Sequence, residues 1–257
     1  MVSELYKRTV YLNRDIPYIF GKRITEYDIK SAGFNIIKHF KFLPEEVVLA
    51  LENLDKHSRH VTIGKLEKHD EELKANLKKG FVACRKKFFM ENDVTDKEIL
   101  SIKKDAIFIL DRKLHNLVFD NIEFVPKHEY HSYLYLDKNE FYMNDKDCDC
   151  KGIKDDKLVL HKDYMLDIIR EFCKLMMIPD KNRQIKFIKE IAVAYRNGEL
   201  AMGYYRELNK ESLFRPKANI RVMSNNMGFN EFEMDLKYLD TSYNYTHYII
   251  PMFQMLI

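Results

Sequence analysis

The chain has 257 residues and 46% of them are hydrophobic, so it can bury a sizeable core and is not a disordered polypeptide. Its 43 Lys and Arg against 40 Asp and Glu give a net charge of +3, which permits nucleic-acid binding without demanding it. Without a secretory signal or an apolar run near the roughly 20 residues that cross a bilayer, we expect a soluble cytoplasmic protein with reduced cysteines.

The N-terminal third alternates strand and helix signals. Residues 6–30 are rich in Tyr, Val and Ile with turn residues between them, which predicts two short strands. Apolar positions over 31–42 predict a short helix, and Pro44 is typical of the start of another.

The remaining pattern mixes helices and strands without strict alternation. Residues 65–90 predict one long charged helix, and a strand pair is expected around Lys103 and Lys104. Residues 122–143 predict further strands that end in a hairpin, and helices are expected over 161–198. This order favours an α+β fold with an antiparallel sheet over a doubly wound sheet.

Two acidic residues stand out by their surroundings. Asp28 ends a predicted strand, and Asp105 is expected inside an apolar one, where a charge is costly unless it is paired. Carboxylates on adjacent strands can hold two divalent metals about 3.5–4 Å apart for phosphoryl transfer. The alternative is a surface Asp, or one paired with Lys103 or Lys104.

Residues 28–34, Asp-Ile-Lys-Ser-Ala-Gly-Phe, resemble the first motif of family B DNA polymerases. Residues 103–109, Lys-Lys-Asp-Ala-Ile-Phe-Ile, look like the Asp-Thr-Asp-Ser-Ile-Phe hairpin of that family. Asp105 falls on its second, metal-holding Asp, and Lys103 takes the place of the first. Residues 136–142 and 151–153 resemble the later lysine-and-tyrosine strand and Lys-Gly pair of the palm.

The resemblance implies a minimal polymerase without an exonuclease domain. It places a palm in residues 1–160, a helical fingers insertion at about 43–92, and a thumb with the C-terminal segment in 161–257. Asp28 and Asp105 would be the catalytic residues and the ligands of Mg²⁺ or Mn²⁺.

The fingers signature of that family is absent, so basic residues are expected to hold the triphosphate in its place. The expected nucleotide-binding residues are Ser31, Gly33, Arg59, Arg85 and Lys86. The expected nucleic-acid-binding residues are Lys138, Tyr142, Lys151 and Gly152.

The fifth residue after the first Asp of the family motif is a bulky aromatic that excludes a 2′-hydroxyl. Here that position is Gly33, which would admit ribonucleotides. If the alignment is shifted by one residue, Phe34 is the gate and deoxynucleotides are the substrate.

These features predict a template-directed nucleotidyltransferase, a small RNA or DNA polymerase or a primase, from a phage or mobile element acting in the host cytoplasm. Its expected partners are template and primer, nucleoside triphosphates, and other replication or transcription proteins, with no membrane. The alternative is a non-catalytic nucleic-acid- or protein-binding α+β subunit of a replication or transcription complex, which Lys103 favours because its charge would repel metal ions.

Overall fold

The computed structural model describes residues 2–136, 139–144, 148–151, 171–172, 174–175, 180–197, 199, 218–222 and 232–234. The chain divides into two compact units. The first consists of Met1–Ile16 and Lys22–Tyr130, and the second of Pro17–Gly21 and His131–Ile257. The predicted domain boundary between residues 160 and 161 lies outside the described residues.

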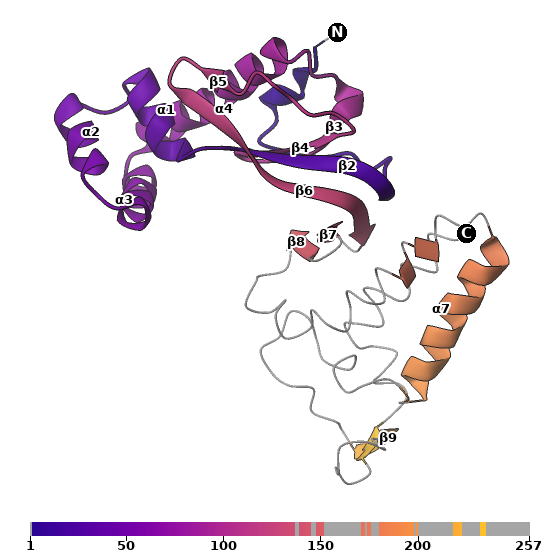
Figure 1. Cartoon of the computed structure of the whole chain (residues 1–257). Helices are drawn as coiled ribbons and strands as arrows, with labels where there is room; N and C mark the ends of the chain where they lie inside the picture. The colour runs from indigo at the N-terminus through magenta and orange to yellow at the C-terminus, as the bar shows by residue number, and fades with distance from the viewer. Residues whose placement is uncertain are drawn as a thin grey trace. The chain divides into compact units, whose positions relative to one another are not determined.

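The first unit contains four α-helices among its described residues, together with two short 3₁₀ helices and a set of strands (Figure 1). In chain order these elements are η1 (Glu4–Lys7), β1 (Val10–Leu12), β2 (Tyr18–Ile29), α1 (Ala32–Phe40), α2 (Glu45–Glu52), α3 (Lys56–His69), α4 (Glu71–Glu91), η2 (Asp96–Glu98), β3 (Ile99–Lys103), β4 (Ala106–Leu110), β5 (Val118–Phe119) and β6 (Ile122–Leu136). Strands β2 and β6 extend into the second unit.

The described elements of the second unit are β7 (Asn139–Met143), β8 (Cys148–Lys151), α7 (Lys181–Arg196), β9 (Ala218–Val222) and β10 (Phe232–Met234). β7 pairs with β6 and β8, and β9 pairs with β10. In the expected hairpin, Leu136 of β6 is paired with Asn139 of β7. Residue 198, the last of the range 161–198 in which helices are expected, lies outside the described residues.

The main sheet has the strand order β1-β3-β4-β2-β6 in the first unit and continues through β7 and β8. Every pair whose register the structure describes is antiparallel, which confirms the α+β class. The two predicted strands before residue 30 are β1 and β2, and residues 122–136 form one strand rather than two despite Pro126 within it.

Helix α4 covers one face of the sheet. Its Phe88 stacks on Phe124 of β6, with ring centroids 4.1 Å apart, and lies 5.6 Å from the ring of Tyr27 on β2. Since side chains alternate along a strand, Glu26 and Asp28 point to the opposite face from Tyr27. Burial of Tyr27 against the helix therefore fixes which way Asp28 faces.

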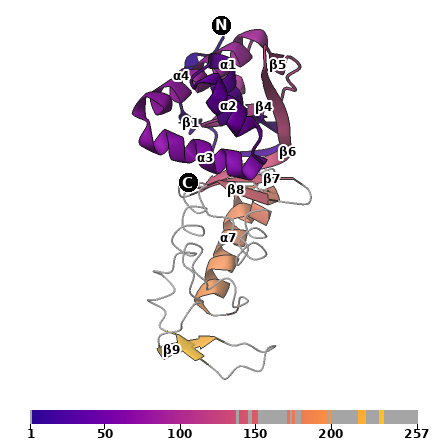
Figure 2. The same cartoon turned by 90° about the vertical axis from the view of Figure 1, so that its left-hand side faces the viewer.

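The predicted long helix over 65–90 is wrong, because it is broken at Asp70. Asp70 has extended backbone angles, and its carboxylate accepts a hydrogen bond of 2.8 Å from Leu73 N, so it caps the start of α4. Helices α1, α2 and α3 group together at one end of the first unit (Figures 1 and 2). Among the described residues, no helix has the length and hydropathy to cross a membrane.

Candidate catalytic site

Asp28 and Asp105 come together through the register of β2 and β4. Tyr27 is paired with Ile107, so the next step along both strands brings Asp28 opposite Ala106, the neighbour of Asp105. Asp105 does not lie inside a strand, as the sequence suggested. It lies in the two-residue turn of the β3–β4 hairpin, which Lys103 and Ala106 close as a pair.

The turn that carries Asp105 is anchored from two sides. Lys104 adopts a left-handed conformation with φ of 56°, and its N–H donates to the Thr9 carbonyl at 2.8 Å. The guanidinium of Arg85 on α4 donates to the carbonyls of Lys104 and Tyr6. Arg85 was expected to bind nucleotide, but it is fully buried, so its position in the structure suits support of the turn instead.

The electrostatics at the two carboxylates favour a cation. Burial, and next the negative charge of Asp28, raise the pKa of Asp105, while Lys104 and Lys127 partly oppose that shift. Asp28 Oδ1 is buried and accepts no hydrogen bond, and Asp28 Oδ2 lies 3.6 Å from Lys127 Nζ. A buried oxygen without a donor, beside a second carboxylate, fits a divalent metal ion.

The described residues offer few protein ligands for such a metal ion. Within the described part of the chain, no group of three or more His, Cys, Asp or Glu side chains is arranged to hold a metal ion. Asp28 and Asp105 would therefore supply two carboxylates, which suits Mg²⁺, because this ion keeps several waters and takes further ligands from phosphate groups.

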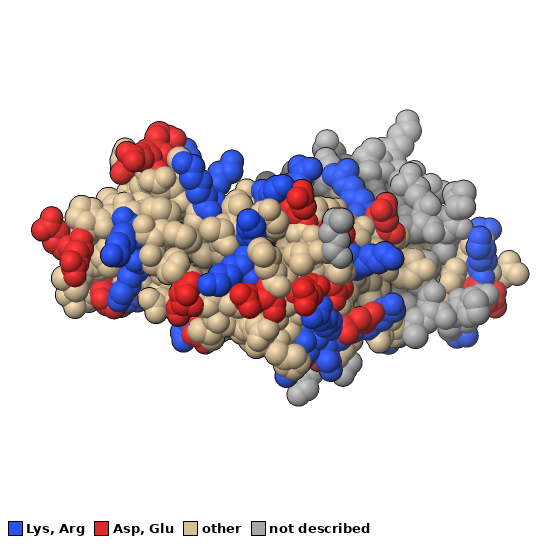
Figure 3. All heavy atoms as spheres, turned by 90° about the horizontal axis from the view of Figure 1, so that it is seen from above, with Lys and Arg blue, Asp and Glu red and all other residues tan. Residues whose placement is uncertain are grey.

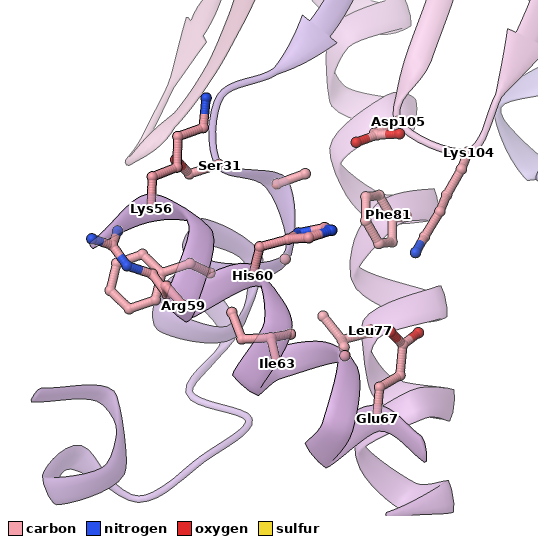
Figure 4. A pocket seen from close by; sticks show the side chains of 14 residues that line it. Ser31, Lys56, Arg59, His60, Ile63, Glu67, Leu77, Phe81, Lys104 and Asp105 are labelled. Carbon is pink, nitrogen blue, oxygen red and sulfur yellow. The ribbon is translucent and has the colours of Figure 1, made fainter. Parts of the chain in front are cut away.

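A pocket of about 250 Å³ opens beside Asp105 (Figure 4). Ser31 and Gly33, both expected to contact nucleotide, line it from the beginning of α1. Leu77 and Phe81 of α4 add apolar surface. The pocket thus lies between α1, the helix that follows Asp28, and the turn that carries Asp105.

Helix α3 supplies cations on the opposite side of the pocket from Asp105 (Figure 4). They are Lys56 and Arg59, and His60 also lines the pocket from this helix; only Arg59 of the three was expected from the sequence. The guanidinium of Arg59 lies 4.5 Å above the ring centroid of Phe34, and its Nη2 donates to the Leu54 carbonyl at 2.8 Å. This double restraint holds Arg59 at the pocket wall.

The residues of α3 that the sequence analysis missed had a recognisable signal in the sequence. Asp55 caps α3 by accepting hydrogen bonds from the N–H groups of His57 and Ser58, so the helix begins at Lys56. Positions 56, 59 and 60 then have the spacing of one helix face. Lys127 was also missed, and only the pairing of β6 with β2, which the sequence does not reveal, brings it to Asp28.

The other expected contact residues lie elsewhere. Lys86 is exposed on α4, with its Nζ 6.0 Å from the ring centroid of Tyr6, and it does not line the pocket. In the second unit, the buried Tyr142 donates to Glu140, and Lys151 is ion-paired with Asp149 at 2.6 Å. The remaining two expected residues, Lys138 and Gly152, lie outside the described residues.

The fold and site define an α+β protein with a carboxylate pair beside a cation-lined pocket. The family model described as Bacteriophage PBS1 gene 130 protein matches residues 1–255, so the chain belongs to this family. That match indicates a phage origin. A comparison with curated proteins found no match.

Proposed function

We propose that this chain is a template-directed nucleotidyltransferase, a small RNA or DNA polymerase or a primase. One observation carries the proposal: Asp28 and Asp105, 77 positions apart, converge where β2 and the β3–β4 hairpin end, beside a pocket lined by cations. Paired carboxylates next to a pocket that carries Lys and Arg side chains are the arrangement that two-metal phosphoryl transfer needs.

In this reaction Asp28 and Asp105 would hold Mg²⁺ or Mn²⁺. Bound there, the metal would activate a primer 3′-hydroxyl and stabilise the departing pyrophosphate. The cations of α3 would orient the triphosphate, with Arg59 held for that task by Phe34 and Leu54. The N–H groups at the start of α1, next to Ser31, would add further donors for phosphate.

Gly33 and Phe34 both line the pocket, and the burial of the Phe34 ring favours Gly33 as the residue beside the sugar. A Cβ at Gly33 would lie 3.4 Å from Ile63 Cγ2, and both residues line the pocket. Phe34 is 5% exposed and lies beneath Arg59. A glycine at this wall favours acceptance of ribonucleotides, and Gly33→Tyr is expected to reduce their use more than that of deoxynucleotides.

Contact with the template would be local rather than spread over a basic surface. On the face drawn in Figure 3, Lys and Arg side chains alternate with Asp and Glu. Binding through a few phosphate contacts is expected to weaken as salt concentration rises, but less steeply than for a protein with a continuous basic patch.

A second candidate function has a specific observation in its favour. The ammonium of Lys127 lies 3.6 Å from Asp28 Oδ2, where it neutralises the carboxylate that a metal would need. A chain with such an ion pair could be a non-catalytic subunit that binds nucleic acid or protein within a replication or transcription complex.

An incorporation assay separates the two functions. Labelled ribo- and deoxynucleotides, Mg²⁺ or Mn²⁺ and primed or unprimed templates would be supplied to the wild type, Asp28→Asn and Asp105→Asn. Loss of either carboxylate is expected to lower the rate by about a hundredfold or more. Asp111→Asn is the matched control, because Asp111 is an exposed residue paired with Lys22. Incorporation that survives both site substitutions would refute the proposal.

A further inference from the structure

Lys127 on β6 bridges two carboxylates of the neighbouring strand β2. Its Nζ lies 3.6 Å from Asp28 Oδ2 and 3.9 Å from Glu26 Oε1. Glu26 and Asp28 are two residues apart, so strand alternation places both on the sheet face opposite Tyr27. One ammonium group therefore faces a pair of acids, and one of these acids is a proposed metal ligand.

We infer that Lys127 is a built-in counter-ion of the metal site, which neutralises Asp28 in the metal-free protein and competes with a divalent cation for the same carboxylate. The inference rests on the proposed function, because it presumes that Asp28 and Asp105 bind metal. It adds that Lys127 sets how tightly the metal ion binds in the absence of nucleotide.

The geometry makes Lys127 a displaceable partner. Its side chain is 49% exposed, whereas that of Asp28 is 24% exposed and that of Glu26 only 2%. The long, flexible stem of a lysine can carry the ammonium into water at little cost. Glu26 keeps a donor when Lys127 moves away, because the Tyr130 hydroxyl donates to Glu26 Oε2 at 3.2 Å.

The same geometry makes Lys127 a competitor of a divalent cation for the Asp28 carboxylate. Asp28 Oδ1 is already without a hydrogen-bond donor, so departure of the ammonium would leave both oxygens of Asp28 open to a cation. A divalent ion at Asp28 would also be repelled by a lysine ammonium that stayed within about 4 Å. Metal that arrives with the negative charge of a triphosphate meets less of this repulsion, so Lys127 favours the metal–nucleotide complex over the bare ion.

Calorimetric titration of the full chain with Mn²⁺, without nucleotide, tests this inference. Removal of the positive charge in Lys127→Met is expected to lower the Mn²⁺ Kd by about two- to fivefold, the range for loss of a partly exposed ion pair. Lys127→Arg keeps the charge and is expected to bind as the wild type does. Lys22→Met removes an equivalent charge from the far part of β2, where Lys22 pairs with Asp111, and is expected to have no effect.

The possible results distinguish failure of the counter-ion role from failure of the proposed function. If Lys127→Met and a second neutral variant, Lys127→Gln, bind Mn²⁺ no more tightly than the wild type, while Asp28→Asn weakens binding, the counter-ion role is refuted and the metal site stands. If neither the wild type nor Lys127→Met binds Mn²⁺ at millimolar concentration, both are overturned. Circular dichroism melting of each variant establishes that the compared proteins are folded.

Discussion

Arg85 and Lys104 are joined by a hydrogen bond from the buried guanidinium of α4 to the backbone carbonyl of the hairpin turn. The same guanidinium donates to the Tyr6 carbonyl at 3.0 Å, so one side chain ties the N-terminal segment, α4 and the turn together. Burial lowers the pKa of Arg85, with opposing contributions from Cys84 and Asp105, and its charge is compensated largely by carbonyl oxygens. The position of Asp105, one residue after Lys104, depends on this contact.

Replacement of Arg85 by Met is expected to destabilise the protein. The carbonyls of Tyr6 and Lys104 lose their guanidinium donor, which should lower the free energy of unfolding by about 1–3 kcal/mol. Denaturation in urea measures the change, and Lys86→Met, at the exposed neighbouring position, is expected to stay within about 0.5 kcal/mol of the wild type. Equal stability of the two variants would show that Arg85 does not anchor the turn.

Two glycines that lie in helices beside the pocket give opposite predictions. A Cβ at Gly80 would collide with Ile36 Cγ2 in the buried contact between α1 and α4, so Gly80→Ala is expected to cost about 1–3 kcal/mol. A Cβ at Gly64 in α3 would meet nothing within 4 Å, and Gly64→Ala is expected to stabilise by roughly 0.5–1 kcal/mol. Thermal denaturation of both variants measures the difference, and a neutral Gly80→Ala would contradict the close packing of α1 on α4.

The raised pKa of Asp105 predicts how its substitution changes stability with pH. In the folded state the ionised form is disfavoured, so Asp105 costs stability as pH rises from its ordinary pKa of 3.8 through its raised folded value. Without divalent metal, Asp105→Asn is therefore expected to melt at a higher temperature than the wild type at pH 7. The advantage should shrink as pH falls below 3.8. A lower melting temperature of Asp105→Asn than of the wild type at pH 7 would contradict a raised pKa of Asp105.

Much of the fold follows from local patterns in the sequence. The β-branched density around Lys103 and Lys104 predicted the β3–β4 hairpin, and Pro44 correctly indicated the start of α2. The break at Asp70 was missed, because the charged residues on both sides read as one continuous helix and a single capping side chain is a weak signal. A strand pattern also does not define the turn inside a hairpin, which is why Asp105 was placed in the strand.

The site was predictable only in part, because some of its residues are positioned by contacts between distant parts of the sequence. The acidic character and order of Asp28 and Asp105 are visible in the sequence, and the register of β2 with β4 then brings them together. The burial of Arg85 depends on its contact with Tyr6, which is 79 positions away in the sequence. The ion pair of Lys127 with Asp28 joins residues that are 99 positions apart. Such long-range contacts leave no local signal, so basic residues alone could not be sorted into supporting and ligand-facing ones.

The proposed function depends most on the sharing of cations by Asp28 and Asp105. The most direct measurement is an anomalous difference map from crystals of the full chain grown with Mn²⁺ and a non-hydrolysable nucleoside triphosphate. Manganese peaks are expected at coordination distance from both carboxylates, with the phosphates directed towards the α3 side of the pocket. Manganese bound elsewhere, or Asp28 still paired with Lys127 beside an ordered nucleotide, would contradict metal binding by Asp28 and Asp105.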